Sequence, residues 1–308
     1  MHVIYFSELF LCVEVTLAGV VVHAMAVGAL SLSYTMIIRS DGFPHLWLGD
    51  FMAIGAYASL ISVKVLGHSP YLGIPEAFIL GGVIGVLFYR AVMKKLHDRG
   101  MGPVYMTLGS LGLGILVSAG ACILAYWLRE RFALYSLSFS LKEYDSSFLG
   151  VPTVVYVSLT LGAALLLSVI YLPKAPQGVI WRAFNEDTCL LQVCGCDPHR
   201  VRAWVWFVAS GLTASLGSLY SLQHVATGSI GKTFMTVMAL TCILGGETLT
   251  GSLIAGSLLS GFFMLFFGSL GQIHGDFYYS LRWAVQPILL WTLLWFKENI
   301  DRFFDGVL

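Results

Sequence analysis

The sequence has little charge. Only 11% of its 308 residues are Asp, Glu, Lys or Arg, against roughly 25% in a typical soluble domain. Apolar residues make up 57% of the chain, and the mean hydropathy is +0.82. A water-soluble surface cannot be built from so few charges, and they are bunched between long apolar runs, as a bilayer requires. We therefore expect a multi-pass protein of the plasma (inner) membrane. Its expected partner is membrane lipid, and no nucleic acid is expected to bind.

The motifs of several enzyme classes are missing from the sequence. It has no phosphate-binding loop of the G-x-x-x-x-G-K-[ST] type, so any ATP must be hydrolysed by another chain. It has neither H-E-x-x-H nor G-x-S-x-G, so nothing indicates an enzyme within the membrane. Its six cysteines form no disulfide framework, and Cys194 and Cys196 lack the second pair that a zinc site needs. We expect no catalytic residue, no metal site and no cofactor bound by this chain.

Apolar runs long enough to span a bilayer recur along the chain. They lie at residues 10–37, 47–66, 71–90, 103–127, 150–173, 203–224, 235–270 and 283–296. This pattern predicts an all-α polytopic transmembrane helical bundle of about eight spans, in a single transmembrane domain over residues 1–308. The stretch 235–270 is long enough for two short helices with a break near 245–251, which would give a ninth span. The tryptophans mostly lie near span ends, where they are expected to anchor the interfaces.

Lys and Arg are unequally shared between alternate loops, which predicts the orientation. The richer set is Arg39, Arg90, Lys94, Lys95, Arg99, Lys174, Arg182, Arg200 and Arg202, and the poorer set is Lys64, Arg129, Arg131, Lys142 and Lys232. The richer set is expected in the cytoplasm, with the N-terminus outside and residues 174–202 forming a cytoplasmic loop. Residues 128–149 form an external loop that either meets an external partner or is a solvated connector. The side of the C-terminus depends on whether 235–270 crosses once or twice.

The cytoplasmic loop contains a predicted amphipathic helix between Arg182 and Leu191. Its apolar contacts are Ala183, Leu190 and Leu191, and its charges are Glu186 and Asp187. Gly195 is expected to end this helix, Asp197 to cap the next one, and Pro198 to occupy that helix's first position. A helix of this kind, lying under the membrane between two spans, could be held and pushed by a soluble partner. The alternative is an ordinary basic cytoplasmic loop.

Two interruptions of the spans hold further candidate residues. Pro44 and Gly49 are expected to break the helix before Asp50, and non-helical backbone at membrane depth is tolerated only where protein or water surrounds it. Asp50 is either a pathway or gate residue or a helix cap. At the second interruption, Gly245 and Gly246 permit a sharp break between half-helices, where transporters commonly build a pathway. Glu247 beside them is either part of that gate or a solvent-facing turn residue.

Three segments together resemble the permeases of the branched-chain amino acid and related sugar importers. In the cytoplasmic loop, the matching residues are Arg182, Ala183, Glu186, Asp187, Gly195, Asp197, Arg200 and Val201. The second segment runs from Tyr34 to Tyr57, with its half from Gly49 to Tyr57 intact, and the third resembles the family's L-G-G-x-G-(S/T) stretch from Leu244 to Gly256. The departures are at His45-Leu46-Trp47-Leu48, at Leu191 and Cys196, around Glu247, and in the C-terminal residues 297–302.

The resemblance implies a permease subunit of an ATP-binding-cassette importer for branched-chain amino acids. The loop that holds Arg182 would dock into an ATPase subunit, and the segments with His45, Trp47, Gly49 and Asp50 and with Gly245, Gly246 and Glu247 would line the pathway or gate. The implied partners are a second permease, homologous or identical, two ATPase subunits that use ATP and Mg, and an external solute-binding protein. The resemblance leaves open an importer of urea or short amides.

Two other classes are weighed against this interpretation. An ion-driven secondary transporter needs ionisable residues near the middle of the membrane and an inverted repeat. The charges within the predicted spans are mostly near their ends, and no inverted repeat is evident. No feature of the sequence favours a membrane-embedded enzyme or a structural scaffold.

Overall fold

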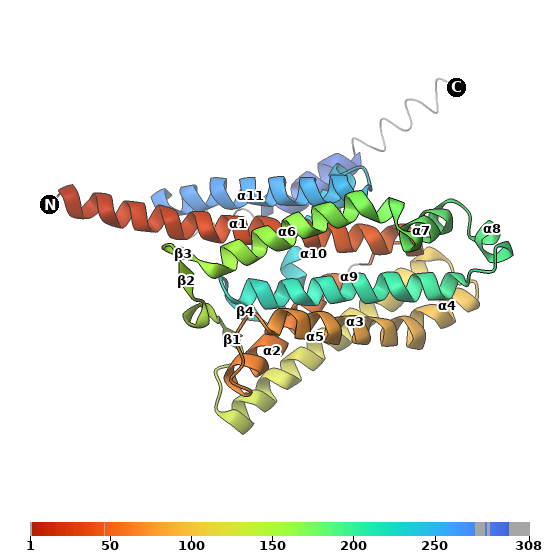
Figure 1. Cartoon of the computed structure of the whole chain (residues 1–308), viewed down its shortest axis with the longest axis horizontal. Coiled ribbons are helices and arrows are strands. Elements are labelled where there is room, and N and C mark those ends of the chain that lie inside the picture. The colour runs from red at the N-terminus through yellow and green to blue at the C-terminus, as the bar shows by residue number, and fades with distance from the viewer. Residues whose placement is uncertain (1, 46, 275–280, 282–283, 296–308) are drawn as a thin grey trace, which may run out of the picture.

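Long helices running roughly along one axis dominate the computed structural model of the chain, which describes residues 2–45, 47–274, 281 and 284–295 (Figure 1). The long helices are α1 (His2–Asp41), α2 (Phe51–Lys64), α3 (Gly73–Phe88), α5 (Pro103–Phe132), α6 (Thr153–Tyr171), α9 (Pro198–Ser221), α10 (Ile230–Leu244) and α11 (Leu249–His274). A further apolar helix spans Ala284–Trp295. The predicted all-α bundle is confirmed.

Short elements connect the long helices. The short helices are η1 (Leu48–Asp50), η2 (Tyr89–Met93), α4 (Lys94–Asp98), η3 (Lys142–Tyr144), η4 (Leu172–Lys174), α7 (Pro176–Glu186) and α8 (Thr188–Val193). The strands are β1 (Ser138–Phe139), β2 (Ser147–Phe148), β3 (Val151–Pro152) and β4 (Ala226–Thr227), paired antiparallel as β1–β4 and β2–β3. Figure 1 shows α7 and α8 at one end of the bundle and the strands at the other.

Helix length separates full spans from shorter helices. Within the described residues, five helical segments are long and apolar enough to cross a membrane: Leu17–Asp41, Gly73–Asp98, Pro103–Phe132, Thr153–Tyr171 and Leu249–Leu270. The predicted run 235–270 is two helices, α10 and α11, separated at residues 245–248. The expected break is therefore present, and this stretch contributes two helices to the bundle.

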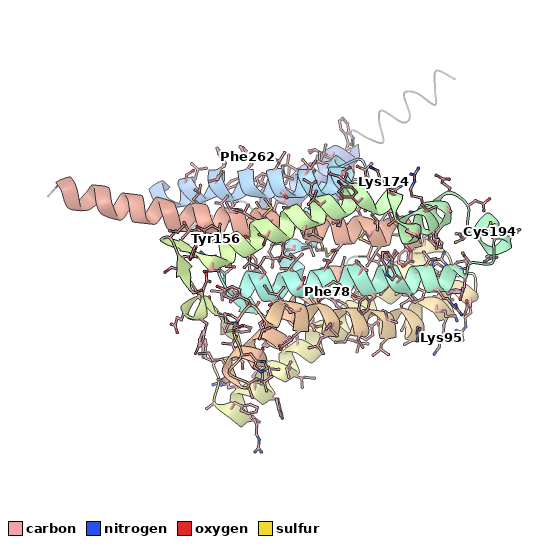
Figure 2. All side chains as sticks on the ribbon, in the orientation of Figure 1. Phe78, Lys95, Tyr156, Lys174, Cys194 and Phe262 are labelled. Carbon is pink, nitrogen blue, oxygen red and sulfur yellow. The ribbon has the colours of Figure 1, made fainter. Side chains whose placement is uncertain are left out.

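Contacts between loops group the connections at the two ends of the bundle, as the charge pattern predicts. At the end predicted to be external, called the external end below, Lys64 Nζ donates to Tyr144 Oη at 2.7 Å. At the opposite end, predicted to be cytoplasmic and called the cytoplasmic end below, His199 Nε2 lies 3.1 Å from Asp98 Oδ1. Figure 2 shows Lys95, Lys174 and Cys194 toward one end of the bundle and Tyr156 toward the other. The predicted external loop 128–149 starts inside α5, which continues to Phe132.

Small residues let α9 pack at the centre of the bundle. Gly217 of α9 lies so close to α2 that an added Cβ would overlap the backbone of Met52. The hydroxyls of Ser59 on α2 and Ser218, the residue after Gly217, are 2.5 Å apart. Close backbone approach of this kind replaces the hydrophobic driving force that helices lack in lipid. The second half of α9 thereby packs closely against α2.

Two tryptophans lie in the interior and not at an interface. Trp47 is 2% exposed and Trp206 is 0% exposed, and their ring centroids are 5.3 Å apart. The expectation that they anchor the membrane surface is wrong, because both indoles join a buried polar cluster described below. Trp291 and Trp295, by contrast, are exposed.

Candidate coupling and pathway site

The cytoplasmic loop folds into two short helices, and the first begins earlier than predicted. α7 starts at Pro176, a residue suited to a helix's first turn. It ends at Glu186, because Asp187 adopts an extended conformation. The Asp187 carboxylate then accepts a hydrogen bond of 2.8 Å from the backbone N–H of Cys189, which caps α8. The single helix expected between Arg182 and Leu191 is therefore interrupted by its own acidic residue.

α7 has a buried face and an exposed charged face. Trp181 and Phe184, which are three residues apart on one side of the helix, are 4% and 3% exposed. Arg182 and Glu186, four residues apart, are exposed on another side, and Ala183 is half-buried. The sequence prediction missed Trp181 and Phe184, although their spacing of three was visible. The exposed face leaves an acidic and a basic group available to a partner.

The segment after α8 ends and restarts the helix as predicted. Gly195 has φ +82°, and the N–H of Cys196 donates to the carbonyl of Leu191 at 3.2 Å. The Asp197 carboxylate accepts a hydrogen bond of 2.9 Å from the N–H of His199, which caps α9. The exposed Arg200 lies 3.7 Å from Asp197, a surface pair of little energetic weight. Cys194 and Cys196 are free thiols.

Two arginines tie the buried face of α7 to the bundle. The Arg39 guanidinium, near the end of α1, lies over the Trp181 ring at 5.6 Å from its centroid. The Arg202 guanidinium, in the first turns of α9, lies over the Phe184 ring at 5.1 Å. Cation–π contacts of this length are attractive, most of all where water is excluded. Movement of α7 would therefore act on α1 and α9.

Arg202 also belongs to a buried cluster centred on Asp41, the last residue of α1. Asp41 Oδ2 accepts hydrogen bonds of 2.9 Å from His45 Nε2 and 2.9 Å from Trp206 Nε1. Its Oδ1 lies 3.6 Å from Arg202 Nε and 3.9 Å from His97 Nε2. The side chains of Asp41 and His45 are 0% exposed. A buried carboxylate is stable only when it is paired and hydrogen-bonded in this way.

The cluster continues from His45 to the segment before α2. Trp47 Nε1 donates to His45 Nδ1 at 3.2 Å, so His45 accepts at Nδ1 and donates to Asp41 at Nε2. Trp47 then leads directly into η1. The structure thus places two of the predicted pathway residues, His45 and Trp47, in buried packing that connects Asp41 with Asp50.

Asp50 precedes a helix that is too short to cross the membrane. α2 has 14 residues, or about 21 Å at 1.5 Å per residue, which is shorter than the roughly 30 Å hydrocarbon core. Because α2 ends at the external side, its first residue lies inside the hydrocarbon region. Gly49 meets Gly231 of α10 there, so closely that a Cβ on either glycine would overlap the other's backbone. The two short helices therefore begin next to each other within the membrane.

Asp50 and Lys232 place two charges at this meeting point. Asp50 is 7% exposed, makes no side-chain cap on α2, and its Oδ1 is buried without a hydrogen-bond partner among the described residues. Lys232, two residues into α10, is exposed together with Thr233, and its charge acts on Asp50. An exposed ammonium at this depth requires water or another protein chain, because lipid would not solvate it.

The second interruption is a turn at the cytoplasmic end. A Cβ on Gly245 would overlap the backbone of Gly251 and Ser252, and Gly246 and Glu247 have φ +61° and +57°. The Glu247 side chain is exposed. Thr248, next along the turn, borders a pocket of about 350 Å³ that is also lined by α7. The structure thus places the turn that contains Glu247 next to the coupling segment.

Three central residues were missed in the sequence: Asp41, Arg202 and Lys232. Asp41 and Arg202 are far apart along the chain, so no local pattern joins them. Lys232 was counted as an external loop residue, although it belongs to α10. A charged residue within four positions of a predicted span end was the one available signal.

The fold is that of a multi-pass membrane protein in which the short helices α7 and α8 lie at one end of the bundle. Residues 16–285 match the model of the family described as "Branched-chain amino acid transport system / permease component". The chain belongs to that family, and the family prediction from the sequence is confirmed. It is accordingly a multi-pass plasma (inner) membrane component of a transport system and not itself an enzyme. The alternative of an ion-driven secondary transporter is not favoured.

Individual relatives agree with this assignment. The chain is 25% identical over 254 residues, covering 80% of this chain and 78% of the other, to a protein of Methanocaldococcus jannaschii named "Probable branched-chain amino acid transport permease protein LivH". Among solved structures, it resembles PsaBC from Streptococcus pneumoniae in complex with Fab, with a TM-score of 0.52, 17% identity, and coverage of 88% of this chain and 89% of that chain. At this identity, the second likeness shows the fold alone.

Proposed function

We propose that this chain forms one half of the transport pathway of an ATP-driven importer for branched-chain amino acids. A second permease, homologous or identical, supplies the other half. Two ATPase subunits, which bind ATP and Mg, dock on the exposed face of α7 and α8, and a solute-binding protein delivers cargo to the external loop 128–149. The family supports this proposal, as do the paired short helices that meet at Gly49 and Gly231.

The observation that carries the proposal is the continuous line of contacts from the coupling segment to the meeting point. Phe184 of α7 contacts Arg202, Arg202 pairs with Asp41, and Asp41 holds His45, which in turn holds Trp47. Trp47 directly precedes η1, which ends at Asp50. A displacement of α7 by an ATPase would reach the pathway through packed side chains, which move between discrete arrangements.

Lys232 suits the proposed cargo. An amino acid carries a carboxylate that needs a counter-charge within the hydrocarbon region, where a charge–charge interaction is stronger than in water. Lys232 is exposed at the start of α10, where the wall of a shared pathway would lie. Asp50 behind it keeps the local charge balanced. Urea or a short amide has no carboxylate to interact with this ammonium.

Uptake of labelled leucine into vesicles that contain the full complex tests the coupling part. We expect the double substitution Arg182→Ala and Glu186→Ala to abolish ATP-dependent uptake and cargo-stimulated ATPase activity. Lys95→Ala, at an exposed cytoplasmic residue outside α7 and α8, is the matched control and should retain both. Normal uptake in the double variant would show that this face does not couple.

The pathway part has a separate test. We expect Asp50→Asn to assemble with the ATPases yet transport leucine poorly, and Lys232→Met to raise the KM for leucine more than it lowers kcat. Lys95→Met, a change of the same kind at an exposed residue of α4, is the control. Unaltered leucine KM in Lys232→Met would remove the proposed contact with the cargo carboxylate.

A further inference from the structure

Two adjoining hollows lie between α6 and α11. The first is an apolar groove of about 350 Å³ with α1 at its floor. Its lining residues are Met25, Leu159, Gly162, Ala163, Leu166, Leu253, Ile254, Ser257 and Leu258. The single hydroxyl among them, that of Ser257, is occupied by a 2.9 Å hydrogen bond to the carbonyl of Leu253. The groove therefore presents hydrocarbon along its whole length.

The second hollow, also of about 350 Å³, continues the first toward the cytoplasmic end. Its lining residues are Arg39, Val169, Trp181, Arg182, Asn185, Glu186, Thr248, Leu249 and Thr250. The two hollows share the same helices: Leu166 and Val169 are one turn apart on α6, as are Leu253 and Leu249 on α11. From Leu159 to Val169 the crevice extends about 15 Å. It is apolar in the membrane and polar at the surface.

The polar end carries unsatisfied groups and an excess of positive charge. The charged residues that line it are Arg39, Arg182 and Glu186, so two positive groups face one negative group. Trp181 is 4% exposed, and its Nε1 has no hydrogen-bond partner among the described residues. Both amide atoms of Asn185 are likewise buried without a partner. Buried donors and acceptors are costly when unpaired, so these groups point to a ligand that is anionic and also carries a donor.

The depth and exposure of the crevice indicate where such a ligand comes from. Arg39 lies at the cytoplasmic end of the α1 span, and Trp181 beside it has the amphipathic ring that suits the headgroup level. Leu166, Ile254 and Leu258 along the groove are exposed, so the groove opens outward. Phe262 further along α11 also lies on the outer edge of the bundle (Figure 2). The surrounding medium there is lipid.

We propose that the crevice between α6 and α11 binds one anionic phospholipid of the cytoplasmic leaflet. An acyl chain lies in the apolar groove, and the phosphate lies between Arg39 and Arg182, whose forked guanidinium groups match phosphate geometry. A headgroup hydroxyl, as in phosphatidylglycerol, donates to Asn185 Oδ1. The bound lipid fills the space between α7 and the turn at residues 245–248, so it contacts α7 on the side that faces the membrane.

Thermal unfolding and native mass spectrometry of the purified full-length chain test this site. We expect dioleoylphosphatidylglycerol to raise the unfolding temperature by several degrees more than dioleoylphosphatidylcholine, because a ligand of the folded state alone stabilises it. Mass spectra should show one retained phosphatidylglycerol per chain. Glycerophosphoglycerol, the same headgroup without acyl chains, should give no shift. A full shift from that soluble compound would overturn the lipid assignment in favour of a small-anion site.

Matched substitutions separate the crevice from general membrane effects. Ala163→Trp fills the groove, whereas Ala164→Trp adds the same bulk at the next, equally exposed position of α6 outside it. Arg39→Gln removes the phosphate contact, whereas Arg90→Gln removes an exposed cytoplasmic charge elsewhere. We expect Ala163→Trp and Arg39→Gln each to abolish lipid retention and the selective shift, and both controls to keep them. Equal lipid retention in Ala163→Trp and Ala164→Trp would overturn the proposal. So would a change of oligomeric state in Ala163→Trp without loss of lipid, because the groove would then be a contact between protein chains.

Discussion

The two helix interruptions near the cytoplasmic half of the bundle are built by different means. The segment from residue 42 to residue 50 is held by buried side chains: Asp41, His45 and Trp206 form hydrogen bonds of 2.9 Å around one carboxylate. The turn at residues 245–248 is held by backbone geometry, since Gly246 and Glu247 adopt positive φ and are exposed. The first interruption is a rigid joint, and the second has the features of a hinge.

This difference assigns different mechanical roles to the two regions. Moving the first segment would separate buried charges from their partners, which costs several kcal/mol, about 3–5 for a broken buried pair. Moving the turn at 245–248 requires changes at a few exposed backbone angles, where no buried side chain is lost. We expect the first region to transmit motion as a unit, and the second to absorb it between α10 and α11.

The largest effect is expected from removing the carboxylate that holds the first interruption. Asp41→Ala leaves Arg202, His45 and Trp206 buried without their shared acceptor, and should lower the free energy of unfolding by about 3–5 kcal/mol. Asp98→Ala is the control, because Asp98 pairs with His199 but is 49% exposed. The measurement is the apparent unfolding temperature in detergent. Equal shifts for the two variants would mean that the Asp41 cluster is not a rigid joint.

A smaller loss is expected where the first interruption meets α10. Gly231→Ala forces a methyl group against the backbone of Gly49, so the two helix ends must move apart, at about 1–3 kcal/mol for overpacking. Leucine uptake should fall with stability, because the meeting point lies beside Asp50. Gly112→Ala in α5, which has no neighbour within 4 Å of its new Cβ, should leave both unchanged. Full uptake in Gly231→Ala would argue that the pathway lies elsewhere.

Much of the fold could be predicted because the bilayer imposes it. Apolar runs of about 20 residues must form spans, and the double glycine at 245 and 246 marks a break that the structure contains between α10 and α11. Caps such as Asp197 before Pro198 are local, so they were visible without tertiary contacts. These features depend on neighbours within a few residues.

The Asp41 cluster could not be predicted, because its members come from distant segments. His97 lies after α3, Arg202 and Trp206 lie on α9, and Trp206 is 165 residues from Asp41 along the chain. No periodic pattern brings them together. The boundary of α7 was missed for another reason: Asp187 looked like one more charge on a helix, but its carboxylate caps α8. Side-chain hydrogen bonding competes with helix continuation at such residues.

A still smaller effect tests the hinge at the second interruption. Gly246 has φ +61° and nothing within 4 Å of an added Cβ, so Gly246→Ala meets only conformational strain, about 1–2 kcal/mol. Gly150→Ala in the external loop, at φ +79° and equally open, imposes the same kind of strain far from α7. We expect similar stability losses but slower uptake in Gly246→Ala alone. Equal uptake rates in the two variants would remove the distinction between a hinge and an ordinary turn.

The smallest effect is expected from Glu247→Gly. Glu247 has φ +57°, a conformation that glycine adopts without strain but other residues do not. The change should therefore slightly raise the unfolding temperature. If the turn acts through its backbone, leucine uptake should stay within about twofold of the unsubstituted protein. Glu247→Gln, which removes the charge and keeps the left-handed backbone, is the control. A large loss of uptake in both variants would return the carboxylate to the gate and would make the two interruptions alike.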